Sequence, residues 1–284
     1  MRTFLATLVT TLLLTNSASS LEAAFERAST AKLANPHDID LSGDGKLLYV
    51  ADVGNNRIAV LDPNTLKEIG QFAKGRLKGP HDVDLGSDGR LYVADTHNHR
   101  VAIFAPEGTS ARHIGDLKGK FRAPEGAARL ADGTVIAPGA WSGNVLRFRD
   151  GKVMARAGGL SSPHDVEPAG DGNIWLADSA NNRILKMTPE FKILQELKGA
   201  PYKFNGVRYL AVEPDGTLWA ADKYTHRLLA IDPATGELLL TLGTGSPGKG
   251  KNVFRTPEGV VVRGNTLWIS DSGNNRIVRY RITR

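Results

Sequence analysis

The sequence has no cysteine, so disulfide bonds cannot hold the fold together and a hydrophobic core must do so. It also has no apolar run of roughly 18 residues, the length that a membrane-spanning helix needs. No nucleophile elbow, phosphate-binding loop or helical metal motif occurs, which leaves serine hydrolases and nucleotide-dependent enzymes without support. We therefore expect no membrane insertion and a chemistry outside these motif classes.

The first twenty residues differ in kind from the rest of the chain. Arg2 is followed by an apolar run at 4–14 and by small residues at 17–20. This order is typical of a secretory signal peptide, and the absence of a cysteine after the run excludes a lipoprotein. We expect residues 1–20 to be a signal peptide, the protein to be exported to the periplasm or the medium, and residues 21–284 to form one domain.

What the sequence does contain is a repeat. The stretch 79–95, GPHDVDLGSDGRLYVAD, predicts a short strand, a Ser-Asp-Gly turn and a second strand that ends at Asp95. Six copies begin at ANPHDID, KGPHDVD, RAPEGAA, SSPHDVE, NGVRYLA and RTPEGVV, and their equivalent residues are 44, 44, 39, 44 and 50 positions apart. That period is one four-stranded propeller blade, so the sequence predicts an all-β fold, a six-bladed β-propeller over residues 21–284.

The sixth copy lacks one strand. Its third strand is expected at 276–282, and the sequence ends two residues later. Residues 21–29 precede the first copy and have no blade of their own. We expect them to supply the outermost strand of the sixth blade, because this closes the ring and removes an open sheet edge.

One residue in each copy lies where the innermost strand begins, and these six positions face a common axis. They hold three histidines, two glutamates and an arginine: His37, His81, Glu125, His164, Arg208 and Glu258. Three histidines, or two histidines and a glutamate, suit a divalent metal that activates water or polarises a carbonyl. The alternatives are a hydrogen-bonded channel lining with neutral histidines, and a metal-free anion pocket built on Arg208.

The formal net charge is +6, and many of the cations lie in the loops before the six repeat starts. They include Lys118, Lys120, Arg122, Lys249 and Lys251. A basic rim of this kind would steer a small anionic substrate toward the axis, and the alternative is a solvated face without a ligand.

Five of the second strands end in a turn of the form Asp-x-x-x-x-Arg, as in ADVGNNRI, which we expect to be scaffold. Three residues before each Asp stands an aromatic residue that we expect to pack between sheets: Tyr49, Tyr92, Trp175, Trp219 and Trp268. The third copy reads IAPGAWSGNV, which loses both the Asp and the Arg and gains Trp141. Because functional sites often break a local rule, Trp141 is a candidate functional residue.

The PHDV or PEGV strand starts, the DG turns and the DxxxNR turns resemble the NHL-repeat family over residues 30–284. That family includes RNA-binding modules, extracellular scaffolds and enzymes, so the resemblance implies the fold and not the function. Export argues against RNA, and we expect no nucleic-acid partner.

Among the enzymes, the chain resembles the peptidyl-α-hydroxyglycine α-amidating lyases, which hold a catalytic zinc by histidines of Pro-His motifs on alternate blades. Pro80-His81 and Pro163-His164 match that motif, whereas Pro257-Glu258 departs from it, and His37 is the other candidate. The family has a catalytic tyrosine two residues past a closing Asp, the place of Tyr224.

The resemblance also implies a structural calcium, bound in part by the Asp of a Pro-His-Asp motif. Asp38, Asp82 and Asp165 are the residues at that place.

These observations lead to one preferred function and two alternatives. We expect an exported, monomeric propeller with zinc or another divalent metal at the channel mouth, acting as a lyase or hydrolase on a small anionic substrate. The alternatives are a non-catalytic module that binds a cell-envelope polymer or protein, and a lactonase of the gluconolactonase type. The expected roles are metal binding for His81, His164, Glu258 and His37, catalysis for Tyr224 and Arg208, and substrate binding for Glu125, Trp141 and His97.

Overall fold

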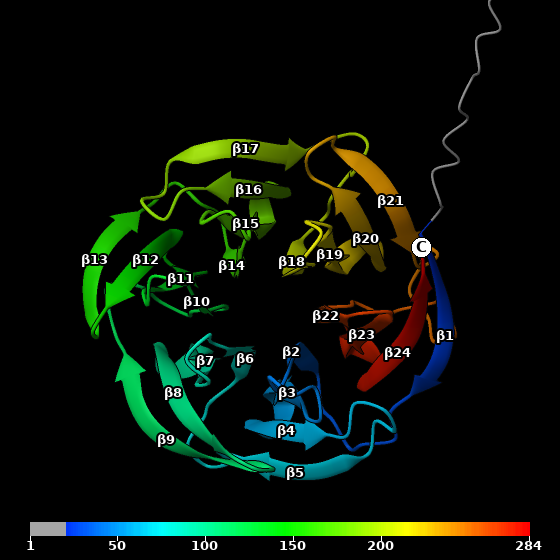
Figure 1. Ribbon diagram of the computed structural model, residues 1–284, viewed down its shortest axis with the longest axis horizontal. Coiled ribbons are helices and arrows are strands. Elements are labelled where there is room, and N and C mark those ends of the chain that lie inside the picture. Colours follow the sequence, from blue (N-terminus) through cyan, green and yellow to red (C-terminus); the bar gives the residue numbers. More distant parts are fainter. Residues whose placement is uncertain (1–20) are drawn as a thin grey trace, which may run out of the picture.

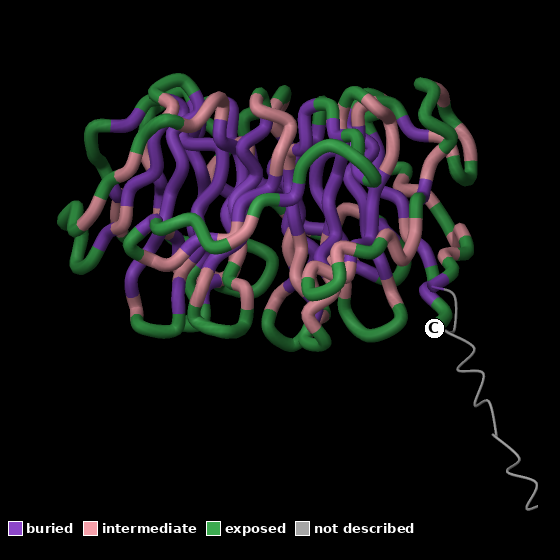
Figure 2. Tube along the Cα trace, turned by 90° about the horizontal axis from the view of Figure 1, so that it is seen from above, coloured by how far each residue is buried: buried purple, intermediate pink, exposed green. Residues whose placement is uncertain are grey.

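The computed structural model describes residues 21–284, so the predicted signal peptide at 1–20 lies outside the described residues. The described chain forms six four-stranded antiparallel sheets arranged as blades around a central channel (Figure 1). This confirms the six-bladed β-propeller. Buried residues form a band between two faces of exposed loops (Figure 2). Within residues 21–284 no helix has the length and apolar character that crossing a membrane would require.

Each blade runs from an inner strand at the channel to an outer strand at the rim. The inner strands are β2 (Pro36–Leu41), β6 (Pro80–Leu85), β10 (Ala128–Arg129), β14 (Pro163–Pro168), β18 (Val207–Val212) and β22 (Val260–Arg263). The second strands are β3 (Leu48–Asp52), β7 (Leu91–Asp95), β11 (Val135–Gly139), β15 (Ile174–Asp178), β19 (Leu218–Asp222) and β23 (Thr266–Asp271).

The two outer positions of each blade complete the sheets. The third strands are β4 (Arg57–Leu61), β8 (Arg100–Glu107), β12 (Asn144–Arg149), β16 (Arg183–Met187), β20 (Arg227–Asp232) and β24 (Arg276–Thr283). The outermost strands are β5 (Glu68–Phe72), β9 (Ser110–Leu117), β13 (Lys152–Ala157), β17 (Ile193–Lys198), β21 (Glu237–Leu242) and β1 (Glu22–Ala28). Short 3₁₀ turns, η1 (Val53–Asn55), η2 (Thr96–Asn98), η3 (Ser179–Asn181), η4 (Lys223–Thr225) and η5 (Ser272–Asn274), follow five of the second strands.

The ring is closed by pairing the two ends of the chain, as the sequence predicted. Strand β1 pairs antiparallel with β24, and the sixth sheet has the order β1-β24-β23-β22 (Figure 1). The ring of Phe25 in β1 meets Tyr280 in β24 with 5.7 Å between the ring centroids. Glu26 forms ion pairs with Arg279 and Arg281 of β24. The outermost strand of the last blade therefore comes from the start of the described chain.

The core lies between neighbouring sheets, where β-branched and aromatic side chains of the second strands meet. The aromatic residues three positions before the closing Asp are at most 5% exposed, which confirms them as packing residues: Tyr49, Tyr92, Trp175, Trp219 and Trp268. Burying an aromatic side chain of this size removes roughly 150–250 Å² of surface from water. Packing between sheets thus replaces the missing disulfides.

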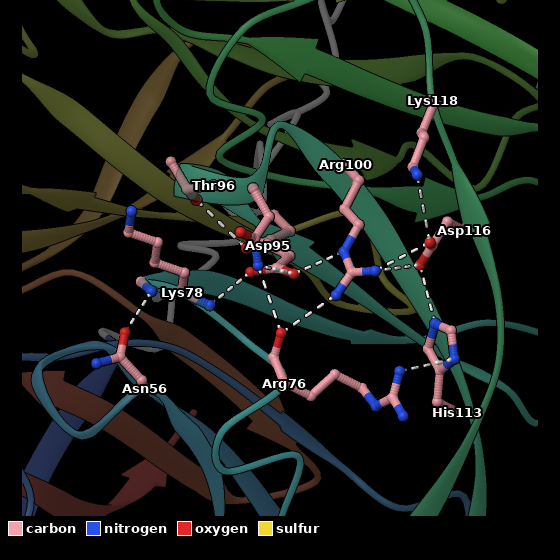
Figure 3. A network of polar contacts seen from close by, with 12 residues as sticks. Asn56, Arg76, Lys78, Asp95, Thr96, Arg100, His113, Asp116 and Lys118 are labelled. Atoms are coloured by element: carbon pink, nitrogen blue, oxygen red, sulfur yellow. Dashed lines mark hydrogen bonds and ion pairs between the residues drawn. The ribbon is translucent and has the colours of Figure 1, made fainter.

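The Asp-x-x-x-x-Arg turns lie on the face of the propeller that holds the channel mouth. Figure 3 shows the polar contacts of one such turn, that of Asp95. One carboxylate oxygen of Asp95 accepts the backbone N–H of Lys78 at 2.7 Å, and the other accepts Nδ2 of Asn98 at 2.8 Å and Nε of Arg100 at 2.7 Å. Nη1 of Arg100 also donates to Oδ2 of Asp116 in β9 at 2.9 Å. Because Asp95 is fully buried, this network ties the loop before the inner strand to the outer strands.

The third blade replaces this charged network by a neutral one. Gly139 stands in the place of the Asp, and Asn144 stands in the place of the Arg. Asn144 Nδ2 donates to the carbonyl oxygen of Lys120 at 2.8 Å, and Ser142 Oγ donates to Asn144 Oδ1 at 2.7 Å. The altered turn keeps the loop in position and presents Trp141 to solvent.

Candidate functional site

Four of the six predicted residues are the second residue of an inner strand: His37, His81, His164 and Arg208. Glu125 and Glu258 lie two or three residues before β10 and β22, next to an isolated bridge between Pro124 and Gly139 and a backbone hydrogen bond from Glu258 to Ser270. The fifth blade lacks the Pro-His or Pro-Glu start, and its strand pairing defines the equivalent residue: Val207 pairs with Asp222 just as Pro80 pairs with Asp95. Arg208 is therefore the equivalent of His81, as expected from the sequence, because each lies fourteen residues before the Asp that closes the second strand. The same face carries the 3₁₀ turns that follow the second strands.

His81 and His164 are oriented in the same way by their own backbones. Nδ1 of His81 lies 2.9 Å from the carbonyl oxygen of Gly79, and Nδ1 of His164 lies 2.7 Å from that of Ser162. Nδ1 of His81 also lies 2.7 Å from Oγ1 of Thr96, whose hydroxyl donates to the carbonyl oxygen of Pro124. A carbonyl accepts only, so each Nδ1 carries the proton and each Nε2 keeps a lone pair. The two Nε2 atoms face the Glu125 carboxylate at 3.9 Å and 3.4 Å.

His37 joins this group from the first blade. Its ring centroid lies 4.4 Å from that of His81, and its Nε2 lies 3.0 Å from Nδ2 of Asn35. Ligand atoms of His37, His81 and Glu125 all lie within 4.8 Å of one another, and all three residues are largely buried. Within the described chain this is the trio that could hold a metal ion, with His164 against the far side of Glu125.

Burial controls protonation in this group. It lowers the pKa of His37, His81 and His164 well below the ordinary value, and for His37 the nearby cations Lys223 and Arg208 lower it further. Burial also raises the pKa of Glu125 to about 8, against the attraction of Arg208. The three imidazoles are therefore neutral near pH 7, and those of His81 and His164 can offer an Nε2 lone pair to a cation.

Glu258 is placed differently from the sequence expectation. The Nζ atom of Lys223, from the turn after β19, lies 2.5 Å from Oε1 of Glu258, and Nε2 of His37 lies 3.8 Å from the same atom. Neither carboxylate oxygen of Glu258 accepts a well-aligned hydrogen bond from the described residues. The sequence prediction placed a metal at His81, His164 and Glu258, with His37 as a further ligand and Glu125 as a substrate contact; in the structure Glu125 is the carboxyl group that lies between His81 and His164. Metal binding by any of them stays a prediction.

Sequence reasoning missed Lys223. The signal was available, because Lys223 follows the closing Asp222 directly and the equivalent residues of the other blades are uncharged.

Arg208 and Tyr224 meet on the fifth blade. Nη2 of Arg208 donates to the hydroxyl oxygen of Tyr224 at 3.2 Å, and its guanidinium carbon lies 5.8 Å from the centre of the tyrosine ring. Lys223 Nζ lies 5.6 Å from the same ring. The Tyr224 side chain is about half exposed at 51%. Two cations and a phenol therefore lie together beside the histidine group, and one of the cations, Lys223, is paired with Glu258.

Tyr209 closes the channel below this group, and sequence reasoning missed it as well. Its hydroxyl lies 2.9 Å from the carbonyl oxygen of His81 and 3.1 Å from that of Glu125, and it donates between them. The residue is fully buried. Other blades have Asp or Gly at this position, so the lone tyrosine in NGVRYLA was the available signal.

At the level of Tyr209 the channel is acidic. Asp38, Asp82 and Asp165 are buried, and burial raises the pKa of all three, that of Asp165 to about 7. Oδ2 of Asp82 has no hydrogen-bond partner among the described residues. A cavity of about 210 Å³ continues toward the opposite face, where Asp40, Asp84 and Glu167 line it.

The two remaining candidates, His97 and Trp141, lie at the mouth rather than on the axis. His97 is in the turn after β7, with its ring centroid 5.7 Å from that of His81. Trp141 is in the turn after β11, 6.1 Å from the ring of His97, and is 56% exposed. The structure therefore brings both into reach of a ligand at the mouth.

Comparison with known proteins gives the fold. The family model described as NHL repeat matches residues 33–61, 77–104 and 254–280. No curated protein sequence matches the chain.

Many solved structures share its architecture. Virginiamycin B lyase from Staphylococcus aureus is 16% identical, with 93% of this chain and 100% of that chain covered and a TM-score of 0.64. A streptogramin B lyase is 16% identical over 93% of this chain and 87% of that chain, with a TM-score of 0.63. A protein of unknown function from Bacteroides thetaiotaomicron is 16% identical over 93% and 76%, with a TM-score of 0.77. At these identities the likeness shows the fold alone.

Proposed function

This chain is an NHL-repeat six-bladed β-propeller, and we propose that its channel mouth is a metal-dependent active site for a small anionic substrate, working as a lyase or a hydrolase. The observation that carries the proposal is the pair His81 and His164. Both donate Nδ1–H to a backbone carbonyl and turn an unprotonated Nε2 toward the same carboxylate, that of Glu125. Fixing one imidazole nitrogen by a carbonyl is the usual support of a metal-binding histidine.

The residues fit a divalent metal by two further criteria. Nε2 of His164 and Nδ1 of His37 are buried without a hydrogen-bond partner among the described residues, which is costly unless a ligand satisfies them. Two or three histidines with one carboxylate are a donor set that suits zinc. Bound there, the ion would polarise a substrate oxygen.

The substrate contacts would come from the fifth blade. Arg208 is suited to a carboxylate because its guanidinium donates two parallel hydrogen bonds. Tyr224 accepts a hydrogen bond from Arg208 and keeps its own O–H for donation, so it can exchange a proton with a reacting hydroxyl. The basic loops before the repeat starts add the positive potential that draws an anion in.

The lyase form of the proposal has separate support. Tyr224, His81 and His164 match the places of functional residues in the peptidyl-α-hydroxyglycine α-amidating lyases, and two proteins of the same fold are lyases. Calcium is proposed as a second ion at the level of Tyr209, because Asp38, Asp82 and Asp165 are buried oxygen donors at equivalent positions and one oxygen of Asp82 lacks a partner among the described residues.

Zinc binding to the purified protein tests the proposal. Calorimetry and metal analysis should show zinc in the parent, and His81→Ala or His164→Ala should weaken zinc binding by at least roughly 100-fold, more than loss of a supporting contact would. His113→Ala is the control, since His113 lies on the outer strand β9. Comparing the zinc affinities of Glu125→Gln and Glu258→Gln shows which carboxylate is a ligand. We expect the larger loss of zinc affinity for Glu125→Gln.

Cleavage of an N-acyl-α-hydroxyglycine tests the chemistry. Tyr224→Phe should retain zinc and lose turnover. A zinc-loaded parent that leaves such compounds intact would exclude the lyase form. A parent without zinc under metal-replete conditions would refute the active site, and the non-catalytic binding module would take its place.

A further inference from the structure

A second ring of residues surrounds the mouth, above the histidine group. It consists of the residues two positions after the end of each second strand: Gly54, His97, Trp141, Ala180, Tyr224 and Gly273. Three blades have a small residue there and three have a large ring. The proposed function gives Tyr224 a role in catalysis. It does not say which part of the substrate His97 and Trp141, the predicted substrate-binding residues, would contact.

The chain makes room for these rings. A Cβ atom at Gly79, whose φ is +56°, would lie 2.6 Å from the imidazole of His97. A Cβ atom at Gly206 would lie 2.5 Å from the ring of Tyr224. Any other residue at either position would push the ring away. The absence of a side chain at Gly79 and Gly206 therefore leaves the space that the rings of His97 and Tyr224 occupy.

Trp141 contacts two imidazoles and a guanidinium. The rings of His97 and His99 lie 6.1 Å and 5.7 Å from it, and the guanidinium of Arg122 lies 5.7 Å from its centre. Even so, the side chain is 56% exposed, whereas Trp175, Trp219 and Trp268 are at most 5% exposed. A braced, exposed indole is typical of a ligand-binding surface.

The rings also form a continuous path from the axis to the surface. Ring centroids are 4.4 Å apart from His37 to His81, 5.7 Å from His81 to His97 and 6.1 Å from His97 to Trp141. Each step is a contact distance for aromatic rings. A ligand whose reacting group lies at His81 would extend along this path onto Trp141.

We propose that the His97–Trp141 surface is a subsite for an aromatic ring of the substrate, whose anionic group is held by Arg208 on the other side of the mouth. The place of the anionic group rests on the proposed function. An aryl group fits better than a sugar, because the groups packed on the indole are imidazoles and a guanidinium. Of these, His99 Nδ1 already accepts the N–H of Ala123. Sugar hydroxyls both donate and accept, and the groups packed on the indole offer them few acceptors.

Binding of simple carboxylates tests the subsite without turnover. The probes are 3-phenylpropionate, propionate and glucuronate, titrated by calorimetry into the purified protein with and without zinc. The parent should prefer 3-phenylpropionate. Trp141→Ala should lower the affinity for 3-phenylpropionate by roughly two- to tenfold, the range of one aromatic contact, and leave the affinity for propionate unchanged. Trp141→Phe should retain most of the affinity.

The intrinsic fluorescence gives a second readout. Because the other three tryptophans are buried, iodide should quench Trp141 selectively, and 3-phenylpropionate should protect it. Met154→Ala is the matched control, since Met154 is 60% exposed on β13 of the same blade.

The outcomes separate the subsite from the active site. Aryl preference that persists in a protein without zinc supports the subsite while the proposed function fails. Zinc binding together with no preference for 3-phenylpropionate, a preference for glucuronate, or Trp141→Ala with parental affinity overturns the subsite.

Discussion

The ion pair between Lys223 and Glu258 predicts a large and asymmetric effect of substitution. Glu258 is fully buried, whereas the Lys223 side chain is 19% exposed. Lys223→Met would leave a buried carboxylate without its cation. Glu258→Gln would leave a lysine that can turn its ammonium group to solvent. We therefore expect Lys223→Met to destabilise the protein much more than Glu258→Gln does.

The magnitudes follow from burial. Removing one partner of a buried pair costs about 3–5 kcal/mol, because the remaining charge is desolvated and uncompensated. Losing a partner from a charge that can reach water costs about 1 kcal/mol or less. At about 2–4 °C per kcal/mol for a domain of this size, Lys223→Met should lower Tm by roughly 6–20 °C. The double variant should resemble Glu258→Gln, because it removes both charges.

Urea and thermal unfolding in the presence of EDTA measure these differences without interference from bound metal. Lys46→Met is the control, since its pair with Asp44 is exposed on both sides and should contribute little. Equal destabilisation by Lys223→Met and Glu258→Gln, or a double variant as unstable as Lys223→Met, would refute the buried-pair argument.

Three further predictions concern the ring and the channel. Deleting residues 21–29 should destabilise the protein by several kcal/mol because the sixth blade loses β1, and unchanged thermal unfolding would contradict this. Calcium at roughly 100 times its Kd should stabilise the parent by about 2.7 kcal/mol, and Asp82→Asn should reduce that gain in a thermal shift assay. Tyr209→Phe should cost about 1 kcal/mol of unfolding free energy and weaken zinc binding, because the hydroxyl no longer holds the carbonyl groups of His81 and Glu125; a parental zinc affinity would exclude this positioning role.

The fold could be predicted because the sequence repeats the unit of one blade six times. A repeated strand-turn-strand unit fixes blade length, the number of blades and the face on which strand starts gather, and the missing strand of the last copy fixes the closure by 21–29. Even the fifth blade, which lacks the Pro-His or Pro-Glu start, was placed by counting back from Asp222 to Arg208. Each of these inferences depends only on spacing along the chain.

The site could be predicted only in part, because which charged side chains pair with one another depends on how far each of them extends. Position in the repeat correctly brought His37, His81, Glu125 and His164 to one place. It could not show that Lys223 reaches across from a neighbouring blade to Glu258, which leaves Glu125 as the carboxylate between two histidines. Equal spacing around an axis does not imply equal roles.

The glycines of the two Pro-Glu-Gly blades explain why carboxylates line only part of the lower channel. A Cβ atom at Gly126 would lie 2.7 Å from the carbonyl oxygen of His164, and one at Gly259 would lie 2.6 Å from that of His37. Both contacts are with the backbone of the next inner strand, which cannot move without displacing a histidine of the mouth. The close approach that sets His164 beside Glu125 and His37 beside Glu258 therefore forbids a side chain just below either glutamate. As a result, Asp at that level can come only from blades without this glycine, and the backbone approach that arranges the mouth also sets the charge of the channel beneath it.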